Sequence, residues 1–230
     1  MKKKILIAVG GTGGHLYPAQ ALAQRLKKEY PSTSILFVGG GLAANPFFSQ
    51  EEYDFEEVAC ETFYNKNVMS SLVSCGKIAK GVCSSVNVMR KFKPDVVVGF
   101  GSHQSLPPLV AAKMRGAPIV LHEANSMPGK VNRFFSRYAR LTGVFFPDAS
   151  MHLKGRSLCV DMPLREGYSP FFFSQREARD YFHLDSEKFT FLVFGGSQGA
   201  LALNTHICSA MMTLAERSTR FQVIHCTGSA

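Results

Sequence analysis

Residues 5–15 read Ile-Leu-Ile-Ala-Val-Gly-Gly-Thr-Gly-Gly-His, an apolar run that ends in a glycine-rich turn. The run predicts a buried strand, and the pattern that follows His15 predicts a helix. A helix N-terminus presents unpaired N–H groups and the positive end of the helix dipole, and glycines let a diphosphate approach that backbone closely. The stretch therefore predicts a strand, a turn and a helix that can bind an anion.

A second turn of the same design lies near the other end of the chain. The apolar residues 189–194 lead into Gly195-Gly196-Ser197-Gln198-Gly199-Ala200. A third glycine cluster, Gly39-Gly40-Gly41, ends another apolar run. One such turn is weak evidence, but two on separate strand-helix units indicate two anionic ligands held by two halves of one protein.

Strands and helices are expected to alternate along the whole chain. Strands are predicted at 4–9, 34–39, 55–59, 96–99, 118–122, 141–145, 189–194 and 221–226, and helices at 15–29, 68–92, 105–115, 129–139 and 200–216, with a polar helix near Arg176, Glu177 and Arg179. Short apolar strands separated by helices are typical of an α/β fold with a Rossmann-like, doubly wound parallel sheet. Ligands of such sheets bind beyond the carboxyl ends of the strands, which brings together the loops 10–15, 99–103 and 122–125.

The pattern changes near Asp161 and then starts again. We expect an N-terminal domain at 1–162 and a second domain at 163–230. About 65 residues follow Arg165, fewer than the ~100–150 of a usual domain, so the second domain is expected to be incomplete.

The composition, 46% hydrophobic and 19% charged residues, is typical of a soluble intracellular enzyme. Residues 1–9 resemble the beginning of a secretory signal peptide. Their apolar stretch ends at Gly10-Gly11, however, and is better explained as a buried first strand. No stretch reaches the ~18 apolar residues of a membrane span. The six cysteines show no Cys-x-x-Cys spacing and the seven histidines no metal-ligand spacing, so we expect reduced, mostly buried thiols, no metal and no cofactor.

The excess positive charge is concentrated in the middle of the chain. Residues 63–146 carry twelve basic and two acidic side chains, a net charge of +10. The whole chain has a net charge of +9, so this segment accounts for the entire excess. Basic and large apolar residues alternate in the predicted helix 68–92 and again in 130–141. This mixture suits an anionic membrane surface, but an ordinary amphipathic helix that buries its apolar stripe explains each stretch equally well. Nucleic acid is disfavoured, because the basic residues alternate with aliphatic more than with stacking aromatic residues.

Several chemistries fit the turns poorly. A nicotinamide site needs an acidic residue after the second strand, where this chain has Gly39-Gly40-Gly41. A P-loop needs Gly-Lys-Ser/Thr, which neither turn contains. The serine of Gly99-Phe100-Gly101-Ser102-His103 has the wrong spacing for a nucleophile elbow.

Four motifs in order resemble the MurG family. They are the turn 10–15, the strand 94–99, Val120-Leu121-His122-Glu123-Ala124-Asn125, and the turn 195–200 followed by Leu203-Asn204. The resemblance implies a GT-B fold of two Rossmann-like domains. It also implies an inverting N-acetylglucosaminyltransferase of peptidoglycan synthesis that needs no metal or cofactor. Its partners would be the donor UDP-N-acetylglucosamine, the acceptor lipid I (undecaprenyl-pyrophosphoryl-muramoyl-pentapeptide) and the anionic cytoplasmic face of the bacterial inner membrane, to which it is peripheral, but not nucleic acid.

The resemblance also implies roles for individual residues. His15 is the expected catalytic base, although it could merely cap its loop. Gly13 and Gly14, with Gly101 and Ser102, would hold the acceptor diphosphate, and Gly196, Ser197, Gln198 and Gly199 the donor diphosphate. Thr12, Gly13, Gly14, Asn125, Arg165 and Ser197 match the donor-contacting positions. Asn125 could instead stabilise its own turn, Arg165 could be solvated at a hinge, and His122 and Glu123 could order their loop.

The chain departs from the family pattern at three places and at its end. It reads Gly101-Ser102-His103 for Gly-Gly-Tyr, Ala124 for Gln, and Asp161-Met162-Pro163 for Gly-Asn-Pro. The rest of a donor domain is missing, so we expect the 230-residue chain to be an inactive fragment. The competing hypothesis is a non-catalytic Rossmann-like module that binds phosphate and membrane.

Overall fold

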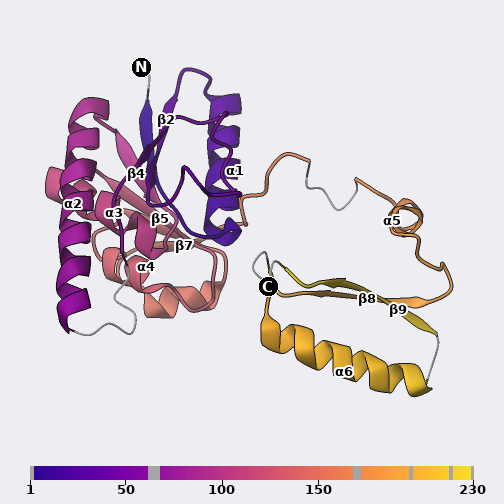
Figure 1. Cartoon of the computed structure of the whole chain (residues 1–230). Coiled ribbons are helices and arrows are strands. Elements are labelled where there is room, and N and C mark those ends of the chain that lie inside the picture. Colours follow the sequence, from indigo (N-terminus) through magenta and orange to yellow (C-terminus); the bar gives the residue numbers. More distant parts are fainter. Residues whose placement is uncertain (1–2, 62–67, 168–171, 197–198, 218–219, 229–230) are drawn as a thin grey trace. The chain divides into compact units, whose positions relative to one another are not determined.

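A computed structural model describes residues 3–61, 68–167, 172–196, 199–217 and 220–228. The chain forms two compact units, Met1–Glu166 and Gly167–Ala230, each of which is described by itself (Figure 1).

The first unit is built on a seven-stranded sheet with the order β3-β2-β1-β4-β5-β6-β7. Its strands are β1 (Lys4–Ala8), β2 (Ser34–Gly39), β3 (Phe55–Glu57), β4 (Val96–Gly99), β5 (Ile119–Glu123), β6 (Leu141–Val144) and β7 (Ser157–Cys159). All neighbouring strands are parallel. The sheet reverses its growth direction between β1 and β4, which confirms the predicted doubly wound arrangement.

Helices cover both faces of this sheet (Figure 1). They are α1 (Gly13–Glu29), α2 (Val68–Phe92), α3 (Leu106–Arg115) and α4 (Lys130–Phe135), with short 3₁₀ helices at His103–Ser105 and Pro147–His152. Alternate residues of β1 point to opposite faces: Ile5 and Ile7 pack with α1, whereas Leu6 and Ala8 pack with α2, α3 and α4. Two hydrophobic cores therefore lie on either side of one sheet.

Glycines permit two close backbone approaches, one at the end of β2 and one in the middle of α2. A Cβ on Gly39 would lie 1.6 Å from the Val9 carbonyl oxygen, and one on Gly81 of α2 would lie 1.9 Å from the Ala59 carbonyl oxygen. Such distances are incompatible with any side chain, so the end of β2 and the middle of α2 both require glycine.

The predicted elements are confirmed, with differences mainly at their ends. Helix α4 ends at Phe135 rather than residue 139, because residues 136–138 continue as a turn in which the Tyr138 N–H donates to the Phe135 carbonyl. Strand β7 was not predicted from the sequence, since a three-residue strand following Arg156 shows too little apolar pattern.

The apolar residues of the two basic stretches, α2 and 130–141, are partly buried in the core and partly exposed. In α2, Met89 is buried in the second core, with Val86 and Phe92 against it, whereas Val73 is exposed. Side chains of residues 62–72, including Leu72, lie outside the described part. In and after α4, Phe135 is buried, but Phe134 and Tyr138 remain largely exposed.

The expectation of mostly buried thiols is wrong. Cys60 is half-buried, and the other five cysteines are exposed. Cys75 and Cys83 lie on the outer face of α2, Cys159 ends the edge strand β7, Cys208 lies on α6, and Cys226 ends β9. No periodicity argument could have distinguished these positions from buried ones, because cysteine occurs in both settings.

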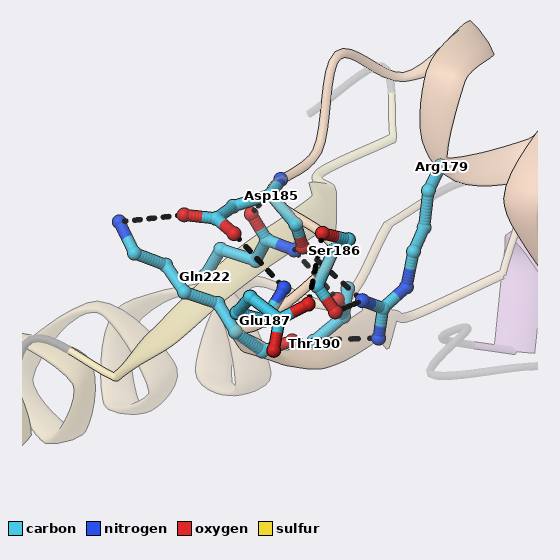
Figure 2. A network of polar contacts seen from close by, with 7 residues as sticks. Arg179, Asp185, Ser186, Glu187, Thr190 and Gln222 are labelled. Atoms are coloured by element: carbon cyan, nitrogen blue, oxygen red, sulfur yellow. Dashed lines mark hydrogen bonds and ion pairs between the residues drawn. The ribbon is translucent and has the colours of Figure 1, made fainter.

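The second unit consists of a parallel pair, β8 (Phe189–Phe194) and β9 (Phe221–Cys226), with α5 (Gln175–Tyr181) and α6 (Leu201–Arg217). Helix α5 begins with a capping box between Ser174 and Glu177. A polar network joins α5 to the sheet (Figure 2): Arg179 donates to the Ser186 and Lys188 carbonyls, and Gln222 contacts Asp185 and Thr190. None of the described side chains of this unit is buried.

Candidate active site

The carboxyl ends of β1, β4 and β5 meet at one edge of the first sheet, and the loops after them line a pocket of about 840 Å³. The pocket contains seven side chains with hydrogen-bonding groups or charge: His15, Glu61, Ser102, His103, Glu123, Asn125 and Lys130. The structure therefore brings together the three loops that the sequence placed in one cluster.

His15 is held in one orientation in the first turn of α1. Its Nδ1 lies 2.8 Å from the Phe100 carbonyl oxygen, which follows β4. Because a carbonyl can only accept, Nδ1 must carry the proton, and Nε2 of the neutral ring is left with its lone pair. His15 lines the pocket, so the fold provides a proton acceptor at its wall.

Glu123, at the end of β5, organises the next loop. The carboxylate is buried and accepts hydrogen bonds from the Asn125 N–H and Nδ2, from the Gly129 N–H, and from Nδ2 of Asn132 in α4, at 2.9–3.1 Å. Four donors compensate the cost of burying this charge. The side chain of Asn125 is thereby fixed at the pocket, so a ligand can use its amide oxygen.

The turn after β4 is strained and internally bonded. Ser102 has a φ of 70°, a region that non-glycine residues rarely occupy. Its hydroxyl bridges to Gln104, donating to Oε1 at 3.0 Å and accepting from the backbone N–H at 3.4 Å. The Gln104 side chain also packs against the glycine turn 10–15 and the glycine cluster 39–41, since a Cβ on Gly10 would lie 2.6 Å from its Cβ and one on Gly40 would lie 3.4 Å from its Cγ.

Burial lowers the pKa of His122, whose ring packs 5.2 Å from the Phe100 ring. The Glu123 charge opposes this shift and His15 adds to it. Partial desolvation also lowers the pKa of His103, against the opposing charge of Glu61. Both shifts favour the neutral form of these two imidazoles, of which His103 lines the pocket.

The first glycine turn is shaped partly by packing and partly by open space. A Cβ on Gly13 would lie 2.8 Å from the Tyr17 ring, whereas one on Gly14 would meet only the Thr12 hydroxyl, at 3.8 Å. Thr12 occupies the N-cap position of α1, but its side chain makes no capping hydrogen bond. The backbone at Gly14 is therefore exposed and accessible to a ligand.

Arg165 is half-buried and stacks on a side chain of α1. Its guanidinium carbon lies 4.0 Å from the centre of the Tyr17 ring, a close cation–π contact. Tyr17 follows His15 by two residues, so Arg165 is anchored beside the helix that carries the candidate base.

The glycine turn of the second unit is described only in part, because Ser197 and Gln198 lie outside the described residues. Gly196 and Gly199 both have positive φ, and the Gly199 N–H donates to the Gly196 carbonyl at 3.0 Å. A Cβ on Gly199 would lie 2.2 Å from the Thr227 carbonyl oxygen, which also accepts a hydrogen bond from Asn204. The turn therefore packs against the end of β9.

Sequence reasoning missed Glu61, which lines the first pocket. It also missed Gln104 and Asn132, which do not line the pocket but bond to its residues Ser102 and Glu123. None of the three belongs to a quoted motif. Within the described stretches, no group of three or more His, Cys, Asp or Glu side chains could hold a metal ion. In those same stretches, every helix is too short or too polar to cross a bilayer.

Comparisons with known proteins agree along the whole chain. The glycosyltransferase family 28 N-terminal domain matches residues 5–144, and the family's C-terminal domain matches residues 190–230. A UDP-N-acetylglucosamine--N-acetylmuramyl-(pentapeptide) pyrophosphoryl-undecaprenol N-acetylglucosamine transferase of Protochlamydia amoebophila is 48% identical over 229 residues. The enzyme of the same name from Bacillus subtilis is 31% identical over 227 residues. The chain spans 60% and 61% of these two relatives, which cover 100% and 98% of it.

Solved structures support the GT-B fold. MurG of Acinetobacter baumannii aligns with a TM-score of 0.68 at 22% identity. The alignment covers 99% of this chain and 61% of the MurG chain. A UDP co-structure of Staphylococcus aureus MnaA aligns with a TM-score of 0.59 at 19% identity, covering 98% of this chain and 61% of its own. With both family domains matched in order on a Rossmann-like sheet, the chain belongs to glycosyltransferase family 28.

Proposed function

We propose that residues 1–230 are the acceptor domain and the opening of the donor domain of an enzyme that transfers N-acetylglucosamine from UDP-N-acetylglucosamine to the muramoyl 4-hydroxyl of lipid I. The observation that carries the proposal is His15, whose free Nε2 lines a polar pocket at the switch point of the sheet. The names of relatives that match the whole chain support the same substrates.

In this proposal, Nε2 of His15 takes the proton of the acceptor hydroxyl as its oxygen attacks the anomeric carbon of the donor sugar. The bond to the UDP oxygen breaks and the configuration inverts, while the electron pair leaves with the diphosphate. Asn125, oriented by Glu123, would position a sugar. The backbone at Gly13 and Gly14, of which Gly14 is exposed and Gly13 buried, would receive the acceptor diphosphate together with Gly101 and Ser102. Thr12, the N-cap residue of α1, and Arg165, which stacks on Tyr17 of the same helix, would contact the donor.

The donor diphosphate would bind the turn of the second unit, at Gly196, Ser197, Gln198 and Gly199. A site must surround most of a ligand for useful affinity, and the described part of this unit has no buried side chain that could form such walls. We therefore expect residues 1–230 alone to bind UDP-N-acetylglucosamine more weakly than micromolar and to show no transfer.

The test is a transfer assay with radiolabelled donor and a lipid I analogue. Residues 1–230 would be assayed alone and joined to the remaining C-terminal part of the Protochlamydia amoebophila relative. Transfer by the joined protein and none by the fragment supports the proposal. If the joined protein folds, binds UDP and still transfers nothing, the acceptor assignment is wrong and the non-catalytic module becomes the better explanation.

The same enzyme would work at the cytoplasmic face of the inner membrane, where its lipid substrate is anchored. Two observations support this location. The exposed rings of Phe134 and Tyr138 lie beside the basic side chains of Arg137 and Lys113, and residues 63–146 carry a net charge of +10. Co-sedimentation with anionic vesicles, weakened by salt and by reversing the charge of Lys77, Lys80, Arg90, Arg133 and Arg137, is the measurement. Salt-independent binding would rule out this electrostatic account.

A further inference from the structure

The pocket that contains His15 has a second imidazole in its wall, that of His103. His103 begins the short 3₁₀ helix after β4, whereas His15 lies in the first turn of α1. Where the family pattern has tyrosine, this chain has a residue that gains or loses a charge near neutral pH. The transfer mechanism proposed above does not use this ring.

The backbone that carries His103 is held by its neighbours on both sides. The Ser102 hydroxyl accepts a hydrogen bond from the Gln104 N–H at 3.4 Å and donates to Oε1 of the same residue at 3.0 Å. The hydroxyl of the buried Ser105 donates to the Ser102 carbonyl at 2.8 Å. His103 itself is exposed and lines the pocket, so an ordered turn presents its ring to a ligand.

The charged groups that share the pocket with His103 come from four other parts of the sheet edge. They are His15 on α1, Glu61 after β3, Glu123 at the end of β5 and Lys130 at the start of α4. The Glu123 carboxylate is compensated by its four hydrogen-bond donors. Glu61 and His15 are the two whose charges act on the pKa of His103.

These two charges act on His103 in opposite directions. Partial burial lowers the pKa of His103, the charge of Glu61 opposes this shift, and the charge of His15 adds to it. Glu61 is itself fixed by Lys77 of α2, whose Nζ lies 3.0 Å from Oε2. With a lowered pKa, His103 is mostly neutral near neutral pH and becomes charged on acidification.

We propose that the charge of His103 controls transfer: the neutral ring permits the reaction and the protonated ring inhibits it. The inference rests on the proposed function, in which Nε2 of His15 takes the proton of the acceptor hydroxyl. That step places a positive charge on His15, and a second positive charge on His103 in the same pocket opposes it by repulsion. Glu61 determines how readily His103 becomes charged, so the two residues together set the acid limit of transfer.

The kinetic test compares three variants of the joined enzyme described above. His103→Lys places a permanent charge at the pocket, and His103→Gln places a permanently neutral side chain there. Met114→Lys adds the same charge at an exposed position of α3 that does not line the pocket. Thermal unfolding and far-UV circular dichroism verify that each variant folds, and kcat is measured with saturating donor and acceptor from mildly acidic to mildly basic pH.

Near neutral pH, His103→Lys should lower kcat by about tenfold or more, whereas Met114→Lys should leave it unchanged. On acidification, His103→Gln should lose a smaller fraction of its turnover than the unaltered enzyme. Equal turnover of His103→Lys and Met114→Lys overturns the proposal, as does a loss in His103→Gln as large as that in His103→Lys. Absence of transfer by the unaltered joined enzyme contradicts the proposed function itself, and the inference with it.

A second measurement tests the pairing of Glu61 with His103 without activity. Proton NMR of the histidine rings follows their titration in the 230-residue chain, and the His103 signal is the one missing from His103→Gln. Glu61→Gln removes the charge that raises the pKa of His103, so the midpoint of this titration should move to lower pH. A midpoint that stays in place or rises would show that Glu61 does not act on the ring and would overturn the inference.

Discussion

Strands β1 and β8 are the first strands of the two units and have similar apolar sequences, but only β1 is buried. Four of the five residues of β1 are buried between helices on both faces, whereas β8 has no buried residue. Phe189, Leu192 and Phe194 of β8 remain more than half exposed. An apolar strand pattern thus specifies a strand, but burial requires neighbouring strands and helices on both sides.

The largest expected difference between the units is in hydrogen exchange. Amides of β1, β4 and β5 should exchange about 10³-fold or more slowly than those of β8 and β9, because a two-stranded sheet without buried side chains has little resistance to opening. Exchange followed by mass spectrometry on residues 1–230 measures both units in one sample. Equal protection of β1 and β8 from exchange would show that the two strands do not differ in stability as their burial predicts.

The next effect separates chemistry from donor binding in the joined enzyme described above. His15→Ala should lower kcat by about 10²–10⁴-fold with little change in the KM for the donor, since it removes the candidate base. Gly199→Ala should instead raise the donor KM, because a Cβ there would lie 2.2 Å from the Thr227 carbonyl oxygen. Steady-state kinetics with varied donor distinguishes the two. Near-normal turnover of His15→Ala would place the base elsewhere.

A matched pair of leucines compares packing directly. Leu121→Ala in β5 should reduce the free energy of unfolding by about 2–5 kcal/mol, because Leu121 is almost completely buried in the second core. Leu192→Ala in β8, which is 60% exposed, should change it by less than about 0.5 kcal/mol. Denaturant unfolding of both variants provides the measurement. A large effect at Leu192 would mean that the second unit packs more tightly than its exposure indicates.

The smallest effect concerns thiol reactivity. Burial raises the pKa of the Cys60 thiol, and the charges of Glu61 and Glu57 raise it further, so less reactive thiolate is present near neutral pH. Cys226, at the exposed end of β9, should be alkylated about tenfold faster. Timed iodoacetamide labelling with peptide mass spectrometry compares them, and raising the pH should narrow the difference. Faster labelling of Cys60 would contradict the burial argument.

The elements and their order were predictable because each leaves a local signal. Apolar runs such as 5–9 and 96–99 specify strands, and Gly116 ends α3 with the left-handed conformation that terminates helices. The cluster of loops was also predictable, since parallel strands carry their loops at one edge. In contrast, the contacts of Gln104 and Asn132 depend on which strands are neighbours, and no local pattern contains that information.

The site residues likewise combine features that a local motif predicts with contacts that only the fold determines. The motif around His15 indicated a functional turn, but the hydrogen bond to Phe100, which fixes the ring, joins residues 85 apart in sequence. The suggestion that Glu123 orders its loop is confirmed, but the identity of its four donors could not be predicted, because they come from the following loop and α4. The exposure of the thiols was predicted wrongly, since cysteine carries no directional signal. The roles of Thr12, Arg165 and Ser197 remain predictions.

The strand order has a consequence for synthesis on the ribosome. β2 pairs with β1, β3 with β2, β4 with the other edge of β1, and β5, β6 and β7 each with the strand made just before. No strand of this sheet waits for a partner that is translated later. A nascent chain that emerges at ~5–20 residues per second can therefore extend the sheet strand by strand. The pocket around His15 can then form while residues beyond 166 are still being added.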